Sequence, residues 1–281
     1  KGDTITVFDF YDEIKTNQGA QQVLFQMTIN KVFEKEYGSK VSDKEVDKEL
    51  AKQKKQLGNQ FDAYLAQQGL TEETAKKQIR SNMLLEYAVN QAAKKDIKES
   101  DYKAAFESYT PEVTAQIIKL DSEDKAKEVL EAAKAEGADF AQIAKDNSTD
   151  TTTKDKGGEV KFDSGTADIP SQVKEAAFKL DENGISDVIT VSAGQNYSAS
   201  YYIVKLNKKT EKGSDWKKYE KRLKEIIVDG RKQDTNYIRS IIAKAMTNAN
   251  IKVKDDAFKS TFNQYLQNIG VQTSDSSSSS K

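Results

Sequence analysis

Proline is scarce in this chain: among 281 residues, only Pro111 and Pro170 occur. Proline breaks helices, whereas Lys, Glu, Gln and Ala, which are abundant here, lose little side-chain freedom in a helix. Long helices are therefore expected wherever apolar residues recur at helical spacing. Pro111 marks the point where that spacing stops, because proline disfavours helical geometry at the residue before it.

Apolar residues recur at helical spacing near both ends of the chain. Ser42 and Glu45 form a capping box, in which each side chain satisfies a backbone N–H of the first helical turn. Each predicted helix has one apolar face that needs a partner, and the simplest arrangement packs the two ends together as one all-α body. Residues 2–7 alternate apolar and polar side chains, which predicts a short strand or an extended arm. The predicted helices cover 18–37, a run from Ser42, 71–89, 216–227, 238–246 and 258–266.

The middle of the chain has a different pattern, in which short strands alternate with short helices. Its order is βααβαββ, which indicates an antiparallel α+β unit of about 100 residues inserted into the all-α body. We expect 1–110 and 211–271 to form the helical body, 111–210 the inserted unit, and 272–281 a disordered serine-rich tail. The predicted strands are 113–120, a short one around 160–162, 185–191 and 200–206.

Composition excludes several classes of function. Forty-four basic residues against forty-five acidic ones leave a formal charge of −1, which gives no general attraction for nucleic acid. The chain has neither histidine nor cysteine, so a typical zinc site, a Ser-His-Asp triad and a disulfide framework are excluded. We expect no metal and no cofactor. No apolar run approaches the roughly 20 residues that span a bilayer.

The inserted unit resembles the parvulin family of peptidyl-prolyl isomerases over nearly all of 113–208. The most specific feature is the Gly157-Gly158 pair before an acidic residue, because two glycines allow positive φ where a loop turns into a strand. The matching segments are VTAQII at 113–118, DFAQIAK at 139–145, STD at 148–150, KGGE at 156–159, EAAF at 175–178 and YIVK at 202–205.

The flanking segments resemble the PrsA-type foldase lipoproteins of Gram-positive bacteria, which include proteinase-maturation proteins. The matching segments are GDTIT at 2–6 and VSDKEVDKE at 41–49. The resemblance implies an extracytoplasmic chaperone for unfolded or partly folded secreted proteins, attached to the outer face of the cell membrane by a lipid-modified cysteine upstream of this chain. An extended helical body with an exposed N-terminal arm is also compatible with a homodimer.

The parvulin resemblance also implies a site, although two of its positions are substituted. The family's two histidine positions hold Gln116 and Tyr202, and its acidic position holds Asp150. Since prolyl isomerisation needs no net proton transfer, a hydrogen-bonded network of these three side chains could still favour the twisted amide. We expect them to converge on a small apolar hollow. The implied pocket residues are Val160, Phe162, Ile169, Val173 and Phe178.

Each of these residues also has a purely structural interpretation. Asp150 could cap a loop, Tyr202 could be a core aromatic, Gln116 could make a structural hydrogen bond, and the pocket residues could belong to the core. Three functions therefore remain open. The preferred one is a foldase with a weakened isomerase or peptide-docking unit. The others are an active prolyl isomerase and a surface interaction protein with a vestigial isomerase fold.

Overall fold

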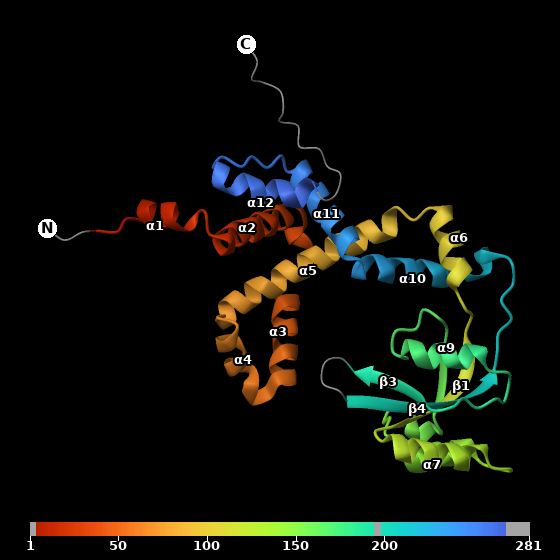
Figure 1. Ribbon diagram of the computed structural model, residues 1–281. Coiled ribbons are helices and arrows are strands. Elements are labelled where there is room, and N and C mark those ends of the chain that lie inside the picture. Colours follow the sequence, from red (N-terminus) through yellow and green to blue (C-terminus); the bar gives the residue numbers. More distant parts are fainter. Residues whose placement is uncertain (1–3, 194–197, 268–281) are drawn as a thin grey trace. The chain divides into compact units, whose positions relative to one another are not determined.

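The computed structural model describes residues 4–193 and 198–267, and the chain divides into two compact units (Figure 1). We call Lys1–Lys98 with Ile227–Lys281 the helical unit, and Glu99–Ile226 the inserted unit. The two ends of the chain therefore form one all-α body around an α+β insertion, as predicted. The predicted serine-rich tail, 272–281, lies outside the described residues.

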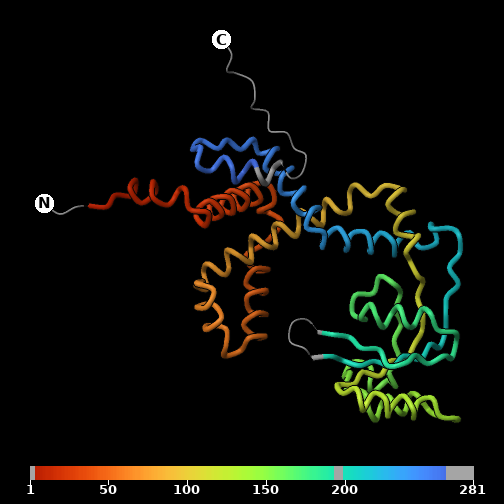
Figure 2. Tube along the Cα trace, in the orientation of Figure 1, coloured from red at the N-terminus to blue at the C-terminus, as the bar shows by residue number. Residues whose placement is uncertain are grey.

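The helical unit is built around α2, whose residues Phe25, Ile29 and Phe33 are buried. Helices α5, α11 and α12 pack against it, and Phe25 meets Phe262 of α12 edge-on at 5.2 Å between ring centroids. Segments from opposite ends of the chain thus share one core, as the trace shows (Figure 2). The helices are α1 (Val7–Ile14), α2 (Gln18–Tyr37), α3 (Asp43–Leu57), α4 (Phe61–Gln67), α5 (Glu72–Lys95), α11 (Thr235–Asn248) and α12 (Asp256–Gln267).

Helix starts in this unit follow local capping chemistry. The predicted capping box of Ser42 and Glu45 is confirmed at the start of α3. A further capping box, Thr6 with Asp9, starts α1 at Val7, the last residue of the predicted strand or extended arm, and Thr6 itself is extended. The Thr6 hydroxyl and the Asp9 carboxylate, three residues apart, accept hydrogen bonds from backbone N–H groups at the start of the helix. Without them these N–H groups would bind only water, so the pair fixes where the helix begins.

The inserted unit contains a four-stranded antiparallel sheet in the order β2-β1-β4-β3. Helices α7 and α8 pack on one face of the sheet and α9 on the other, which separates two apolar clusters. The βααβαββ order agrees with the prediction. The elements are α6 (Glu99–Ser108), β1 (Val113–Leu120), α7 (Glu123–Lys134), α8 (Phe140–Asn147), β2 (Glu159–Phe162), α9 (Ser171–Lys179), β3 (Ile189–Ala193), β4 (Ser198–Lys208) and α10 (Glu220–Gln233), which runs past the end of the unit.

The boundaries of the inserted unit lie outside the predicted range of 111–210. Helix α6 and the first turns of α10 join it because aromatic side chains pair across the two connecting segments. Tyr102 stacks on Trp216 at 5.1 Å and Phe106 on Tyr219 at 5.8 Å between centroids. The Lys212 ammonium lies 4.5 Å from the Phe106 ring centroid and donates to the Phe106 carbonyl at 2.6 Å. Helical periodicity alone does not reveal such pairing.

Candidate functional site

An apolar cluster lies between the sheet and α9, and it contains all five predicted pocket residues. Phe162 and Val173 are fully buried and serve as core, whereas Val160, Ile169 and Phe178 are only partly buried at its margin. The rings of Phe162 and Phe178 are 5.8 Å apart between centroids. The three partly buried residues are therefore the ones among the five that remain accessible at the margin of the cluster, and their role as a pocket stays a prediction.

Tyr202 belongs to the same cluster and lies directly opposite Lys119 in the β1–β4 ladder. Burial raises the pKa of the Tyr202 phenol, and the negative charge of Asp150 raises it further. Tyr202 is thus a neutral hydrogen-bond donor at neutral pH. Asp150 is therefore near enough to Tyr202 for its charge to act on the phenol, and the convergence of the two side chains on one site stays a prediction.

Asp150 follows α8 and is held by the loop that it begins. Its carboxylate accepts hydrogen bonds from the Thr152 and Thr153 hydroxyls, each at 2.7 Å, and from the Thr152 backbone N–H at 3.0 Å. Partial burial raises the pKa of Asp150, but these hydrogen bonds outweigh that effect and lower it below its ordinary value. The positive charge of Lys119 acts in the same direction. Asp150 is therefore both an ordered anion and a loop cap, and Lys119 is a neighbour that the sequence reasoning missed.

Gln116 does not join this group, so the expected convergence of the three residues is wrong for Gln116. Its neighbours Ala115 and Ile117 contribute to the cluster under α9, and successive side chains of a strand point to opposite faces. Gln116 therefore lies on the face covered by α7 and α8, where its amide nitrogen donates to the Gly157 carbonyl at 2.9 Å. This is the structural hydrogen bond named as the alternative interpretation of Gln116.

The Gly157-Gly158 pair has the positive-φ turn that the sequence indicates. Its φ angles are +65° and +79°, a region that side-chain-bearing residues rarely adopt. A Cβ on Gly158 would collide with the backbone of Ile117, whose N–H donates to the Gly158 carbonyl at 2.8 Å. The pair is thus needed to seat β2 beside β1, which carries Lys119 at its far end.

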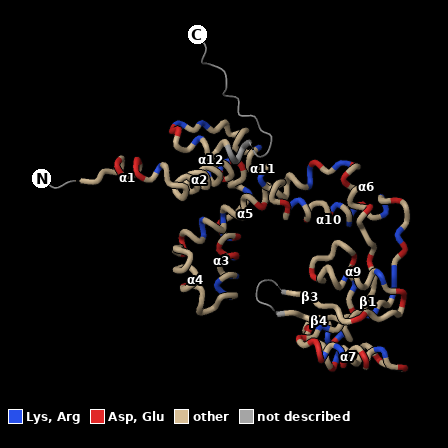
Figure 3. Tube along the Cα trace, in the orientation of Figure 1, with Lys and Arg blue, Asp and Glu red and all other residues tan. Residues whose placement is uncertain are grey.

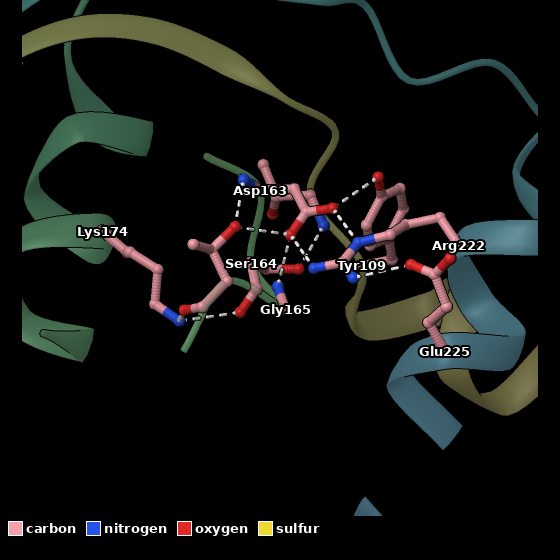
Figure 4. Close-up of polar contacts among 9 residues, drawn as sticks. Tyr109, Asp163, Ser164, Gly165, Lys174, Arg222 and Glu225 are labelled. Atoms are coloured by element: carbon pink, nitrogen blue, oxygen red, sulfur yellow. Dashed lines mark hydrogen bonds and ion pairs between the residues drawn. The ribbon is translucent and has the colours of Figure 1, made fainter. Parts of the chain in front are cut away.

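A buried ionic cluster around Asp163 was not predicted (Figure 4). Arg222 of α10 binds the Asp163 carboxylate with two nitrogens, at 2.6 and 2.9 Å, and the Tyr109 hydroxyl donates to it at 3.1 Å. Burial raises the pKa of Asp163, but the bonds from Arg222 and other donors lower it overall. The carboxylate is 8% exposed and remains ionised beside its guanidinium.

This cluster fixes the loop that follows β2. The Gly165 N–H donates to Asp163 at 2.9 Å, and the Lys174 ammonium of α9 donates to the Ser164 and Thr166 carbonyls at 3.0 and 2.6 Å (Figure 4). Residues on both sides of the sheet are tied to this loop: Tyr109 and Thr110 before β1, and Arg222 after β4. The loop leads to Ile169 of the apolar cluster. No local motif signals the pair, since Asp163 and Arg222 are 59 residues apart.

The helical unit presents a second candidate site, an apolar surface over α1 and α2. Several large side chains here are mostly in solvent: Ile5 84%, Val7 87%, Phe8 70%, Phe10 59%, Val23 59% and Met27 61% exposed. Two adjoining cavities of about 660 and 380 Å³ share Leu24 and Met27, and together we call them the α2 groove. Its lining comes from α1, α2, α11, α12 and the segment between α11 and α12.

Two further features bear on ligands and membranes. In residues 4–193 and 198–267, no three His, Cys, Asp or Glu side chains are grouped so as to hold a metal ion. Nor does this part of the chain contain a helix with the length and apolar character needed to cross a bilayer.

Comparison with known proteins gives a consistent result. The model of the PPIC-type PPIASE domain matches residues 109–208. Foldase protein PrsA of Streptococcus sanguinis (strain SK36) is 60% identical over 270 residues, which are 96% of this chain and 80% of that protein. The crystal structure of foldase protein PrsA from Streptococcus pneumoniae str. Canada MDR_19A has a TM-score of 0.84 at 55% identity, covering 94% of this chain and 97% of that one. For PrsA from Lactococcus lactis, the TM-score is 0.70 at 38% identity, with the same coverage.

Proposed function

Because this chain belongs to the PrsA family of foldase proteins, which act outside the cytoplasm, we propose that its helical unit holds partly folded secreted proteins in the α2 groove and on the exposed side chains of α1. The inserted unit contributes a peptide-docking surface with a weakened isomerase site. The exposure of the α1–α2 side chains is the observation that carries this proposal.

That exposure is unusual for a folded domain. Contiguous apolar surface in water is costly, and a surface of this kind commonly marks a binding site. Apolar contact is non-directional, so it tolerates many client sequences. Met27 also has a flexible thioether side chain, which adapts to differently shaped partners.

An aggregation assay with a reduced, unfolded client tests the chaperone role. We expect the full chain to suppress aggregation and Met27→Asp to lose most of that effect, because a charge would enter the groove that Met27 lines. Tyr64→Asp is the matched control, since Tyr64 is 44% exposed on α4 and does not line the groove. Suppression that is equal for wild type and Met27→Asp would contradict the proposal.

A second candidate function, prolyl isomerisation, is favoured by the shared neighbourhood of Asp150 and Tyr202 beside the apolar cluster. Uncatalysed isomerisation faces a barrier of about 20 kcal/mol. A neutral phenol and an ordered carboxylate could favour the twisted amide through placed hydrogen bonds.

A protease-coupled assay with a proline tetrapeptide tests this second function. We expect Tyr202→Phe and Asp150→Ala to lower any measured rate about tenfold, the effect of losing one hydrogen bond of roughly 1.4 kcal/mol. Gln116→Ala, on the other face of the sheet, should leave the rate unchanged. A wild-type rate equal to that of buffer alone would contradict the proposed isomerase function. Tight binding of one defined partner without affinity for unfolded chains would instead favour the vestigial interpretation.

Two finer proposals concern membrane attachment and assembly. Family resemblance supports a lipid anchor on the outer face of the cell membrane, which labelling of the cellular protein with a radioactive fatty acid would test. The exposed apolar side chains of α1 support a homodimer, which sedimentation equilibrium of the chain would test. The balanced charge, with basic and acidic residues interspersed along the trace, argues against nucleic acid as a partner (Figure 3).

A further inference from the structure

The α2 groove is uncharged over one part and basic at another. Helix α2 carries no charged residue from Gln18 to Asn30, and this stretch is continuous tan in Figure 3. The 380 Å³ cavity is lined entirely by uncharged residues. The 660 Å³ cavity adds Lys31 and Lys35, with Glu36 beside them. Met27, Lys31 and Lys35 follow one another at four-residue spacing, so they share one face of the helix.

The two lysines are not neutralised by the rest of the described chain. Over residues 4–193 and 198–267, neither Lys31 nor Lys35 makes an ion pair, whereas Lys54 and Lys76 of the same unit bind Glu72 and Asp47 at 2.7 and 2.6 Å. Glu36, the acidic residue of the lining, accepts a hydrogen bond from the Tyr37 hydroxyl at 3.0 Å. The groove therefore has a net positive charge at one end and an apolar floor at the other.

We propose that the α2 groove selects client segments in which an apolar stretch is followed or preceded by an acidic residue. This inference rests on the proposed function and adds a substrate class to it. The apolar side chains of the segment occupy the uncharged part, near Val23 and Met27. The carboxylate of the segment reaches Lys31 and Lys35. Complementary charge at the rim of an apolar site sets orientation and partner choice more than total affinity.

The expected preference is modest, because both ammonium groups are exposed. Solvent-exposed ion pairs contribute little each, so two of them should give about a fivefold preference in Kd. Salt screens such pairs, so the preference should shrink when the ionic strength rises from about 0.1 M to about 1 M. Apolar contacts in the groove should not weaken over that range.

Fluorescence anisotropy with three peptides tests this inference on the full chain. The peptides share one apolar stretch and end in Asp-Asp, Asn-Asn or Lys-Lys. We expect the Asp-Asp peptide to bind about fivefold more tightly than the Asn-Asn peptide, and the Lys-Lys peptide most weakly. The variant Lys31→Gln/Lys35→Gln should bind all three alike. The matched control is Lys44→Gln/Lys48→Gln, a pair with the same spacing on the exposed face of α3, which should keep the preference.

Several results would overturn the inference. Equal binding of the acidic and neutral peptides, with aggregation suppression intact, would remove the charge preference and leave the proposed function standing. If the full chain neither bound the peptides nor suppressed aggregation, both the charge preference and the proposed chaperone function would be wrong. If Lys31→Gln/Lys35→Gln changed only the monomer–dimer equilibrium, or only binding to anionic phospholipid vesicles, the occupant would be a second copy of the chain or a membrane.

Discussion

The inserted unit covers its large apolar side chains, whereas the helical unit leaves a set of them in solvent. Among the described residues, all large hydrophobic side chains that are clearly exposed belong to the helical unit, from Ile5 to Ile251. The inserted unit instead packs apolar clusters on both faces of one sheet and encloses an ion pair. This difference teaches that a well-packed core and an apolar surface can coexist in one unit: both units have buried cores, and only the helical unit also leaves large apolar side chains in solvent.

The largest expected effect concerns the turn that seats β2 in the inserted unit. Gly158→Ala should destabilise that unit by about 4 kcal/mol, because the φ of +79° and a collision with Ile117 act together. Trp216, the single tryptophan, stacks on Tyr102 within the unit, so its fluorescence during urea unfolding reports this change. An unchanged urea midpoint would mean that the sheet does not need the close approach of β1 and β2.

The contrast in exposure can be tested directly with two truncations. Phe162→Ala removes a fully buried ring and should cost about 3–5 kcal/mol through lost burial and the cavity left behind. Met27→Ala, at a side chain 61% exposed, should change the stability of the helical unit by less than about 0.5 kcal/mol. Urea unfolding followed by Trp216 fluorescence and far-UV circular dichroism measures both. If the two variants lost similar amounts of unfolding free energy, the contrast between a covered and an exposed apolar side chain would be wrong.

The ion pair supplies the next effect in size. Arg222→Met leaves the Asp163 carboxylate buried without its partner and should destabilise the inserted unit by about 2–4 kcal/mol. Lys221→Met, at the exposed preceding residue, is the control and should stay within about 0.5 kcal/mol of wild type. If both variants unfolded at the same urea concentration, the Asp163–Arg222 pair would contribute nothing to stability.

The same pair predicts a dependence on pH. The pKa of Asp163 in the folded unit lies below its ordinary value of 3.8. The ionised carboxylate therefore contributes stability that is complete above that ordinary value and is lost as pH falls through the lower folded pKa. Urea midpoints should drop below about pH 4, and they should drop less in Arg222→Met, where no guanidinium lowers the pKa. Equal slopes in the two proteins would assign the acid sensitivity to other carboxylates.

The smallest effect is a gain in the helical unit. Gly230 lies inside α10 with open space around it, so Gly230→Ala should stabilise by about 0.5–1 kcal/mol by restricting the unfolded chain. Gly58→Ala should act in the opposite sense, since Gly58 has a φ of +51° at the end of α3. Thermal unfolding followed by circular dichroism separates the two signs. A loss of stability in Gly230→Ala would show that α10 needs flexibility there.

Most of the local structure could be predicted from neighbouring residues. The Ser42–Glu45 cap, the βααβαββ order and the Gly157-Gly158 turn each depend on residues a few positions apart, where propensity and hydrogen-bonding geometry act directly. The predicted pocket residues also fall in one cluster. They were taken from the parvulin resemblance, and a known fold already specifies which strands and helices pack together. The predicted extended arm overlaps α1 only at Val7, because the Thr6–Asp9 cap starts the helix there, while Thr6 itself is extended.

The candidate site was predicted only in part, because both faces of the sheet are apolar. Residues Val113, Ala115 and Ile117 lie on one face of β1, and Ile118 and Leu120 on the other, so hydrophobic alternation does not tell which face holds the site. A shift of one residue moves a side chain from one face to the other. Gln116 was grouped with Asp150 and Tyr202 because the parvulin resemblance gives it one of the family's histidine positions, and its place on the strand directs it to the other face.

The sequence by itself determined most of the helices and strands, the α+β insertion between two helical ends, and the absence of histidine and cysteine chemistry. Only the tertiary structure decided the sheet face of Gln116, the Asp163–Arg222 pair and the α2 groove, whose lining joins Leu24 to Ala245. The physical reason is range. Capping and periodicity act within a few residues along the chain, whereas a buried ion pair or a groove exists only after strand register and helix packing bring distant segments together.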